Sequence, residues 1–184
     1  MFFSEIYGSW KEIQRQKYKQ IFSVLGKDFF AALEMKLVLD LGCGIGYFES
    51  FMKENGIKAK IIGIDTEFAR NDFPFVIGDG NELPFKNNVF DAVFCIDAIH
   101  LIKTKDFARV IKKKGLVLFA VFFNNENYEE RKSLVKEKLA GFEILLEFEI
   151  NGKEKEYVVL ARKNNNGTRN ERYSKDNKNV NEIN

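Results

Sequence analysis

A glycine-rich stretch in the first third of the chain holds the residues best suited to chemistry. Gly42, Gly44 and Gly46 alternate with other residues directly after an apolar run. A strand that breaks into a glycine turn and then into a helix lets the backbone approach a ligand closely, and the first N–H groups of the helix stay free to bind it. The pattern predicts a cradle for a nucleotide-like ligand, followed by a helix over residues 47–55.

The residues around these glycines distinguish between ligand classes. A dinucleotide-binding turn has a third glycine where this chain has Tyr47, and a Walker phosphate loop needs a Gly-Lys-Ser/Thr triplet that is missing here. The predicted strand also ends in Asp40, whose carboxylate repels a pyrophosphate but attracts an ammonium group. This combination suits S-adenosylmethionine, with its carboxylate at the helix N-terminus and its ammonium near Asp40.

Four segments resemble, in the same order along the chain, the motifs of class I S-adenosylmethionine-dependent methyltransferases. Within that class, the resemblance is strongest to the small type 11 group. The segments are 40–46, 62–65, 78–85 and 90–96. The resemblance covers roughly residues 36–162. It implies an α/β, doubly wound, Rossmann-like fold with a mostly parallel seven-stranded sheet and an antiparallel C-terminal hairpin. It also implies an enzyme that transfers a methyl group from S-adenosylmethionine.

The resemblance implies a set of cofactor contacts. The ribose hydroxyls bind at Asp65, the adenine amino group at Asp79, and the methionine ammonium near the carbonyl of Ile96. The full expected set is Asp40, Gly42, Cys43, Gly44, Asp65, Thr66, Asp79, Gly80 and Ile96. A strand-end turn carboxylate at Asp65 and a plain turn former at Asp79 are the structural alternatives.

Two candidate catalytic residues, Asp97 and His100, follow the predicted strand 90–96, at the rim where the methyl group should point. Methyl transfer needs mainly alignment and the exclusion of water, so few catalytic residues are required. His100 is either a base that deprotonates a hydroxyl or a residue packed at a helix start. The Asn/Asp-Pro-Pro-Tyr motif of amino-methyltransferases is replaced by the sequence of residues 97–100, which argues against exocyclic adenine amines and glutamine amides as acceptors.

The elements that position these residues follow from apolar periodicity and turn signals. Strands are expected at 36–41, 60–64, 73–77, 90–96 and 116–122. Only 13 residues separate Asp65 from Asp79, so the second crossover helix is expected to shrink to a turn at 67–71. Residues 105–111 predict a short helix, and 112–115 either a solvated turn or an anion contact.

The two ends of the predicted domain differ in character. Residues 1–30 carry apolar side chains at helical spacing, with Gly8 and Ser9 as a possible division, and either cap the cofactor with Trp10 or pack on the sheet. At the other end, a helix that begins at 124–127 and runs to about 139 precedes strands at 142–150 and 156–162. The Asn151-Gly152 pair between these strands predicts a tight hairpin turn.

Composition sets broad limits on the protein. The chain has 184 residues, 45% of them hydrophobic, and a formal net charge of +2, so nothing drives it toward nucleic acid or a membrane. Cys43 and Cys95 lie in the same predicted site without metal-ligand spacing, so no metal and a reducing, cytoplasmic setting are expected. We expect one methyltransferase domain over 1–163, with 1–30 as a helical cap, and a disordered, Asn-rich tail over 164–184.

Three functions remain open from the sequence. The leading hypothesis is a methyltransferase for an unidentified acceptor, with a small molecule favoured and a nucleic acid or protein acceptor possible. A second is a non-catalytic cofactor-binding subunit of a partner-dependent methyltransferase. A third is another nucleotide-dependent enzyme of the same fold, such as an aminopropyltransferase or a nicotinamide-dependent reductase.

Overall fold

The computed structural model describes residues 2–67 and 73–164 of the chain. The described helices are α1 (Phe2–Ala31), α2 (Tyr47–Glu54), α3 (Phe107–Val110) and α4 (Tyr128–Lys138), with a 3-10 turn η1 (Ile99–Leu101). The described strands are β1 (Leu37–Leu41), β2 (Lys60–Asp65), β3 (Phe75–Ile77), β4 (Phe90–Ile96), β5 (Ile111–Phe123), β6 (Phe142–Asn151) and β7 (Lys155–Lys163). No helix among these residues is long and apolar enough to cross a membrane.

The strands of the described residues form one seven-stranded sheet in the order β3-β2-β1-β4-β5-β7-β6. The first five in this order run parallel, and β7 lies antiparallel between β5 and β6. This confirms the expected fold class. The chain order reverses between β1 and β4, because β2 follows β1 on one side and β4 lies on its other side. In such sheets the crevice at the carboxyl ends of the two strands at the reversal is the usual ligand site.

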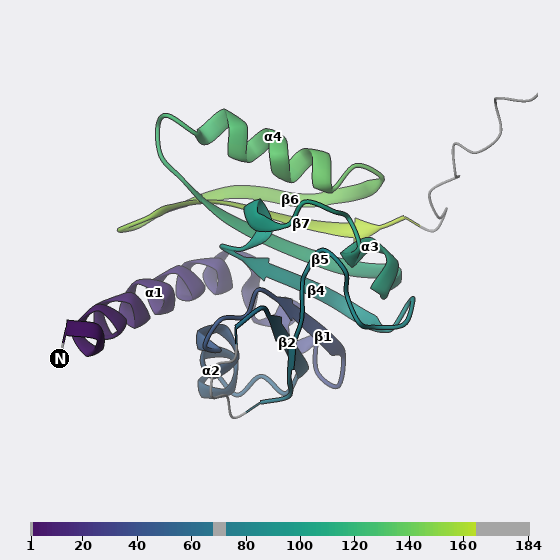
Figure 1. Ribbon diagram of the computed structural model, residues 1–184, viewed down its shortest axis with the longest axis horizontal. Coiled ribbons are helices and arrows are strands. Elements are labelled where there is room, and N and C mark those ends of the chain that lie inside the picture. The colour runs from purple at the N-terminus through teal and green to yellow at the C-terminus, as the bar shows by residue number, and fades with distance from the viewer. Residues whose placement is uncertain (1, 68–72, 165–184) are drawn as a thin grey trace, which may run out of the picture.

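Helices cover the sheet in two layers, and each layer has its own hydrophobic cluster. The first cluster joins α3, α4 and η1 to the sheet and includes Phe107 and Val135. The second joins α1 and α2 to the opposite sheet face and includes Ile21 and Phe51. Figure 1 shows the N-terminal part of α1 reaching out on the same side of the sheet as the β6–β7 turn. The crevice between β1 and β4 therefore has α1 beside it.

Helix α1 has nearly the expected extent but is interrupted at a different place. The possible division at Gly8 and Ser9 is absent, and helical geometry instead breaks at Gly26 (φ 78°, ψ 162°). Glycine accepts this left-handed φ without a steric penalty. Across the break, the rings of Phe22 and Phe30 stack with centroids 4.2 Å apart. The kink thus folds the C-terminal end of α1 back onto its own aromatic face.

The start of β5 corrects one expectation. Residues 112–115 belong to this strand rather than to a turn, and the pairing register shifts where Asp91 faces them. Lys114 adopts a left-handed φ of 61° at this irregularity, while the Nζ of Lys112 lies 2.9 Å from Asp91 Oδ1. The extra residues are accommodated as a bulge, so the lysines form no separate anion-binding loop.

The connection between β6 and β7 and the connection between β2 and β3 can each be compared with the sequence-based expectation. The expected antiparallel hairpin around Asn151-Gly152 is confirmed; Asn151 pairs with Lys155, so the β6–β7 connection has three residues, 152–154. No helix joins β2 to β3 among the described residues, and most of the expected turn at 67–71 lies outside them. The expected tail also lies outside the described residues, except for Asn164, whose Nδ2 donates to the carbonyl of Gly141 at 2.8 Å.

Candidate active site

Two neighbouring cavities open at the crevice where the sheet order reverses. The larger, of about 350 Å³, is lined by Trp10, Gln14, Tyr18, Asp40, Gly42, Cys43, Gly44, Ile45, Tyr47, Phe48, Asp65, Ile96, Asp97, Ala98 and Leu101. The smaller, of about 170 Å³, is lined by Leu41, Gly42, Ile64, Asp65, Thr66, Gly78, Asp79, Gly80, Asn81, Ala98, Leu101 and Ile102. The structure therefore brings all nine expected cofactor residues to these two cavities, which share a border of four residues.

The glycine turn after β1 forms part of the floor between the cavities. Gly42 has a left-handed φ of 78°, and a Cβ built on it would lie 2.3 Å from the Cβ of Ala98, so only glycine fits. Its N–H donates to the carbonyl of Ile64 at 2.9 Å, which pins the turn to β2. A Cβ built on Gly44 would meet no atom within 4 Å. The turn is therefore held against β2 at Gly42, while its backbone at Gly44 is open to a ligand.

Asp65, at the end of β2, holds this turn and borders both cavities. Its Oδ2 accepts the N–H of Gly44 at 2.9 Å, and its Oδ1 accepts the N–H of Glu67 at 3.3 Å. A carboxylate has about four acceptor positions, so lone pairs remain for hydroxyl groups of a ligand. Asp65 is thus both a turn carboxylate and a potential receptor for a diol.

Asp79 and Asn81 shape the smaller cavity. The Oδ1 of Asp79 accepts both the backbone N–H and the side-chain Nδ2 of Asn81 at 2.8 Å, and the backbone hydrogen bond is the main cause that lowers the pKa of Asp79. The Oδ1 of Asn81 in turn accepts the N–H of Lys103 at 2.6 Å. Asp79 is therefore a turn former that also faces the cavity, and Asn81 ties the loop after β3 to the loop after η1.

Helix α1 supplies one wall of the larger cavity. Trp10, Gln14 and Tyr18 line it at helical spacing, and Trp10 keeps 41% of its surface exposed. Tyr18 is buried and packs edge-on against Phe48 of α2, with ring centroids 5.3 Å apart. The aromatic face of α1 thus touches the cavity and the core at once.

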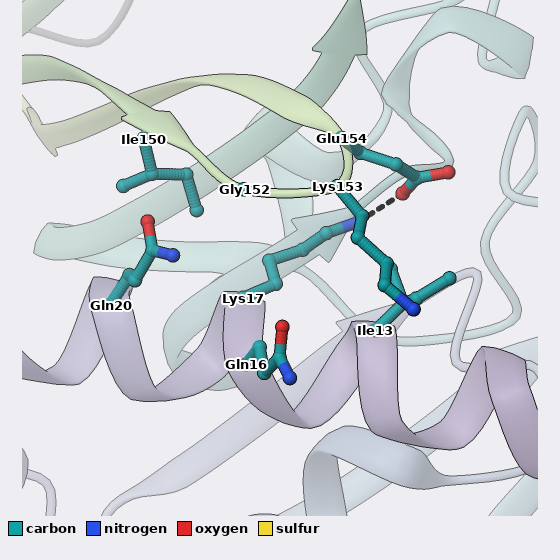
Figure 2. Close-up of a pocket in the computed structure, with 8 residues that line it drawn as sticks. All are labelled: Ile13, Gln16, Lys17, Gln20, Ile150, Gly152, Lys153 and Glu154. Atoms are coloured by element: carbon teal, nitrogen blue, oxygen red, sulfur yellow. Dashed lines mark hydrogen bonds and ion pairs between the residues drawn. The ribbon is translucent and has the colours of Figure 1, made fainter.

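A buried charge cluster joins this helix to the rim of the site. The Nζ of Lys17 contacts Asp97, lies 2.7 Å from Glu156 Oε1 and lies 3.4 Å from Glu154 Oε2, and Gln14 also donates to Asp97 at 3.3 Å. The Lys17 side chain is only 3% exposed and that of Glu156 is 0% exposed. Figure 2 shows Lys17 rising from α1 beneath the β6–β7 turn, with the dashed line marking its ion pair to Glu154.

The charges within this cluster determine what Asp97 can do. Burial lowers the pKa of Lys17, but the carboxylates of Asp97 and Glu156 outweigh it and raise the pKa overall. Burial, and then Asp97, raise the pKa of Glu156 to about 9, whereas the ammonium of Lys17 acts to lower it. The oxygens of Asp97, Glu154 and Glu156 lie within 4.8 Å of one another, a grouping that suits a metal, but the ammonium of Lys17 lies among them. Asp97 is therefore an ion-paired rim residue.

His100 does not line the cavity that Asp97 borders. It borders neither of the two cavities, and its ring meets Phe122 edge-on with centroids 5.8 Å apart. Burial and the nearby Arg131 lower the pKa of His100, so the ring is neutral near pH 7, and its Nδ1 is buried without a hydrogen-bond partner. Phe122 also lines an open groove of about 520 Å³ at the carboxyl end of β5, together with Phe123, Asn124, Asn125, Glu126, Lys153, Glu154 and Lys155.

Sequence reasoning missed several residues of the larger cavity. Gln14, Tyr47 and Leu101 line it, and Glu49 of α2 is buried close to its floor. A signal for Glu49 existed, because this acid falls between Phe48 and Phe51 on the buried face of a short amphipathic helix. No comparable signal marks Gln14, since its place on the wall depends on how α1 docks.

Comparisons with known proteins agree with the observed fold. Residues 39–119 match the family described as "Methyltransferase domain". The PH0226 protein of Pyrococcus horikoshii has a similar structure, with a TM-score of 0.63, 17% identity, and coverage of 89% of this chain and 99% of that one. A chain in the complex of the Haloferax volcanii Trm112 methyltransferase activator with its methyltransferase partner gives a TM-score of 0.60 at 17% identity, covering 88% and 97%.

One curated relative is the malonyl-[acyl-carrier protein] O-methyltransferase of Legionella pneumophila. It is 32% identical over 98 residues, which span 45% of this chain and 34% of that protein. The matches to curated relatives span about a third to a half of those proteins' length.

Proposed function

The segment 39–119 belongs to the methyltransferase domain family, and from this premise we propose that the chain binds S-adenosylmethionine and transfers its methyl group to an acceptor. The observation that carries the proposal is the pair of cavities that share Gly42 and Asp65. Asp40 lies in one cavity and Asp79 in the other. An elongated ligand with an ammonium at one end, a ribose in the middle and an adenine at the other end matches this order of acids.

The residues of the chain have defined tasks in this proposal. S-adenosylmethionine, when bound, supplies a methyl carbon that its sulfonium has already activated. The open backbone at Gly44 cradles the ligand, Asp65 accepts its ribose hydroxyls, and Asp79 accepts from its adenine amino group. Trp10 and Tyr18 cover the larger cavity from α1 and exclude water from the reacting groups.

The acceptor side lies over the carboxyl end of β5. The groove there combines the apolar surfaces of Phe122 and Phe123 with amide and charged side chains from two loops. His100 contacts Phe122, and its neutral ring can take a proton from an acceptor hydroxyl. Asp97 is held by Lys17, so its task is to shape the rim. A small molecule with an apolar part and a hydroxyl or similar nucleophile fits this groove.

The test is methyl transfer by the purified chain. The protein is incubated with S-adenosylmethionine labelled in its methyl group and with separate fractions of small metabolites, RNA and protein. We expect label in the small-molecule fraction and none when the Asp65→Ala variant is used. Label in none of the fractions, with a folded protein that also fails to bind S-adenosylmethionine, contradicts the proposal.

A second candidate is a methyltransferase that needs an activating partner. The Haloferax volcanii structure favours it, because it is a complex of a methyltransferase activator with a methyltransferase, and the matched chain shares the fold over 97% of its length. Turnover by the isolated chain excludes this candidate. Binding of S-adenosylmethionine without turnover, followed by turnover after addition of a cell extract, supports it.

A further inference from the structure

Two polar side chains meet one aromatic ring at the carboxyl end of β5. The ring of His100, in η1, approaches the ring of Phe122 edge-on, with centroids 5.8 Å apart. The guanidinium carbon of Arg131, in α4, lies over the same Phe122 ring, 5.6 Å from its centroid. Phe122 itself keeps 37% of its surface exposed. Three separate elements therefore bring a histidine, an arginine and an accessible apolar surface together.

Both polar side chains have a buried nitrogen whose hydrogen-bonding capacity is unused. The Nδ1 of His100 and the Nε of Arg131 are buried, and neither has a hydrogen-bond partner. The ion pairs found within residues 2–67 and 73–164 include none to Arg131. Buried polar atoms in folded proteins nearly always have a partner, so two exceptions around one ring indicate a place for a ligand.

The charges at this place favour an anion. The cation of Arg131, on α4, acts on the imidazole of His100 and adds to the effect of burial in lowering its pKa, whereas Asp97, at the end of β4, acts in the opposite sense. Asp97 is already paired with Lys17. A guanidinium presents its N–H groups as a fork that matches the oxygens of a carboxylate or a phosphate. A neutral imidazole with its proton on Nδ1 adds one more donor.

The position of this pair suits the methyl acceptor rather than the cofactor. His100 and Arg131 line neither of the two cavities assigned to S-adenosylmethionine. Leu101, the next residue of η1, borders both cavities, and Phe122 lines the groove at the end of β5. A molecule that touches Phe122 and reaches along η1 therefore approaches the proposed cofactor from the groove.

We propose that Arg131 and His100 form an anion subsite that binds an oxyanion group of the methyl acceptor, while the apolar part of the acceptor lies on Phe122. This rests on the proposed function, since the acceptor is that of the methyl transfer. Arg131 donates to the oxyanion through Nε, and His100 donates through Nδ1, so its other nitrogen stays available to the acceptor hydroxyl. The oxyanion is a recognition group, distinct from the atom that receives the methyl group. The substrate class is thereby an acidic small molecule with an apolar part.

His100 provides a direct readout, because it is the only histidine in the chain. Its imidazole resonance is followed by proton NMR of the full chain, with and without S-adenosylhomocysteine, the demethylated product of the cofactor. The probes are phenylacetate, phenyl phosphate and the neutral 2-phenylethanol. We expect a saturable shift with an anion, and binding of the alcohol that is at least about tenfold weaker. A bound anion offsets the charge of Arg131, so the pKa of His100 should rise when it binds.

The two anions distinguish the two sources of an oxyanion. Tighter binding of phenylacetate identifies a carboxylate on the acceptor, and tighter binding of phenyl phosphate identifies a phosphate. An equal response to the alcohol and the anions, or no response to any probe, overturns the inference. That result leaves the proposed function standing when calorimetry shows that S-adenosylhomocysteine binds, whereas a folded chain that binds no S-adenosylhomocysteine overturns the proposed function itself.

The variant Arg131→Gln assigns the effect to the arginine, because it removes the cation. We expect at least about a tenfold loss of affinity for the preferred anion, no rise in the pKa of His100, and unchanged affinity for S-adenosylhomocysteine. Lys136→Gln is the matched control, since it removes an exposed cation from the same helix and should bind the anion as wild type does. Wild-type anion affinity in Arg131→Gln contradicts the assignment. If this variant does not fold, the comparison of the anions with the alcohol on the wild-type chain still decides the question.

Discussion

Asp65 is the side chain on which the glycine turn and the proposed ribose contact both depend. Replacing it by Ala removes the acceptor of the Gly44 N–H and the acceptor proposed for the ribose hydroxyls. We expect Asp65→Ala to weaken S-adenosylmethionine binding by about 1.5–3 kcal/mol, the range for hydrogen bonds to a charged group. Calorimetry measures this, with the exposed Asp28→Ala as the matched control. Unchanged affinity in a folded variant would remove Asp65 from the site.

Glu49 offers a test that needs no ligand. Burial raises its pKa to about 10, so between about pH 4.5 and 10 the folded chain binds more protons than the unfolded chain, and this group's contribution to the free energy of unfolding falls as the pH rises. Glu49→Gln lacks this loss. We expect its free energy of unfolding to increase relative to that of wild type from pH 5 to pH 8, by up to about 1.4 kcal/mol per pH unit, and its relative melting temperature to rise with it.

The control for this experiment is Glu34→Gln, which changes an exposed acid. Its melting temperature should stay parallel to that of wild type over the same pH range. If Glu49→Gln also runs parallel to wild type, the carboxyl of Glu49 is ionised in the folded chain, and its raised pKa is ruled out.

Residues that depend on local spacing were predictable from the sequence, and residues that depend on docking were not. The positions of Gly42 and Asp65 in the site could be predicted, because each lies at the carboxyl end of a strand that is recognisable in the sequence. Gln14 and Lys17 reach the site only because α1 packs against the sheet beside β4 and the β6–β7 turn. His100 shows the same limit, since its position in the sequence suggested the rim but its ring turns toward Phe122.

At the scale of elements, the ion pairs of Lys17 connect α1 to the sheet and to the β6–β7 hairpin. Removing one partner of a buried ion pair leaves the other charge without compensation, at a cost of about 3–5 kcal/mol. We expect Lys17→Met to lower the free energy of unfolding by this order at pH 7, because the buried carboxyl groups around Nζ lose their cation.

Chemical denaturation of the variant and of wild type at pH 7 measures this loss. Lys19→Met is the matched control, because it removes an exposed lysine two residues away on the same helix. Equal destabilisation by both variants would show that the cluster does not hold α1 in place.

Helix α1 also provides an optical report of the cavity. Trp10 is the only tryptophan in the chain, lines the larger cavity and is 41% exposed. A ligand that fills this cavity changes the water around the indole, so we expect a saturable change in emission on adding S-adenosylhomocysteine. The half-point should agree with the calorimetric affinity. Constant emission through calorimetric saturation would place the ligand away from α1.

The elements themselves were predicted well where the pattern is local. Strand β4 has the expected bounds, and α2 and α4 begin and end close to their turn signals. The kink in α1 and the three-residue hairpin connection were not predicted. In both cases tertiary contacts override the local sequence signal. Phe22 stacks on Phe30 across the kink, and Asn151 pairs with Lys155 as part of β6.

At the scale of the whole molecule, the arrangement of the sheet makes the site. The reversal of strand order between β1 and β4 opens the crevice, and the antiparallel β7 brings the β6–β7 turn back beside it. The sequence implied this topology through its resemblance to methyltransferases. It did not imply that α1 would serve the core and the cavity wall together. Residues 1–30 are thus more than a removable cap, because Tyr18 and Ile21 belong to the hydrophobic core.

The central claim is that the two cavities together hold S-adenosylmethionine. The most direct measurement is calorimetric titration of the wild-type chain at pH 7.5 with S-adenosylmethionine and, separately, with NAD⁺. Our account predicts saturable binding of one S-adenosylmethionine per chain and no heat of binding with NAD⁺ at the same concentrations, because Asp40 and Asp65 repel a pyrophosphate. Saturable binding of NAD⁺ with no response to S-adenosylmethionine would contradict it.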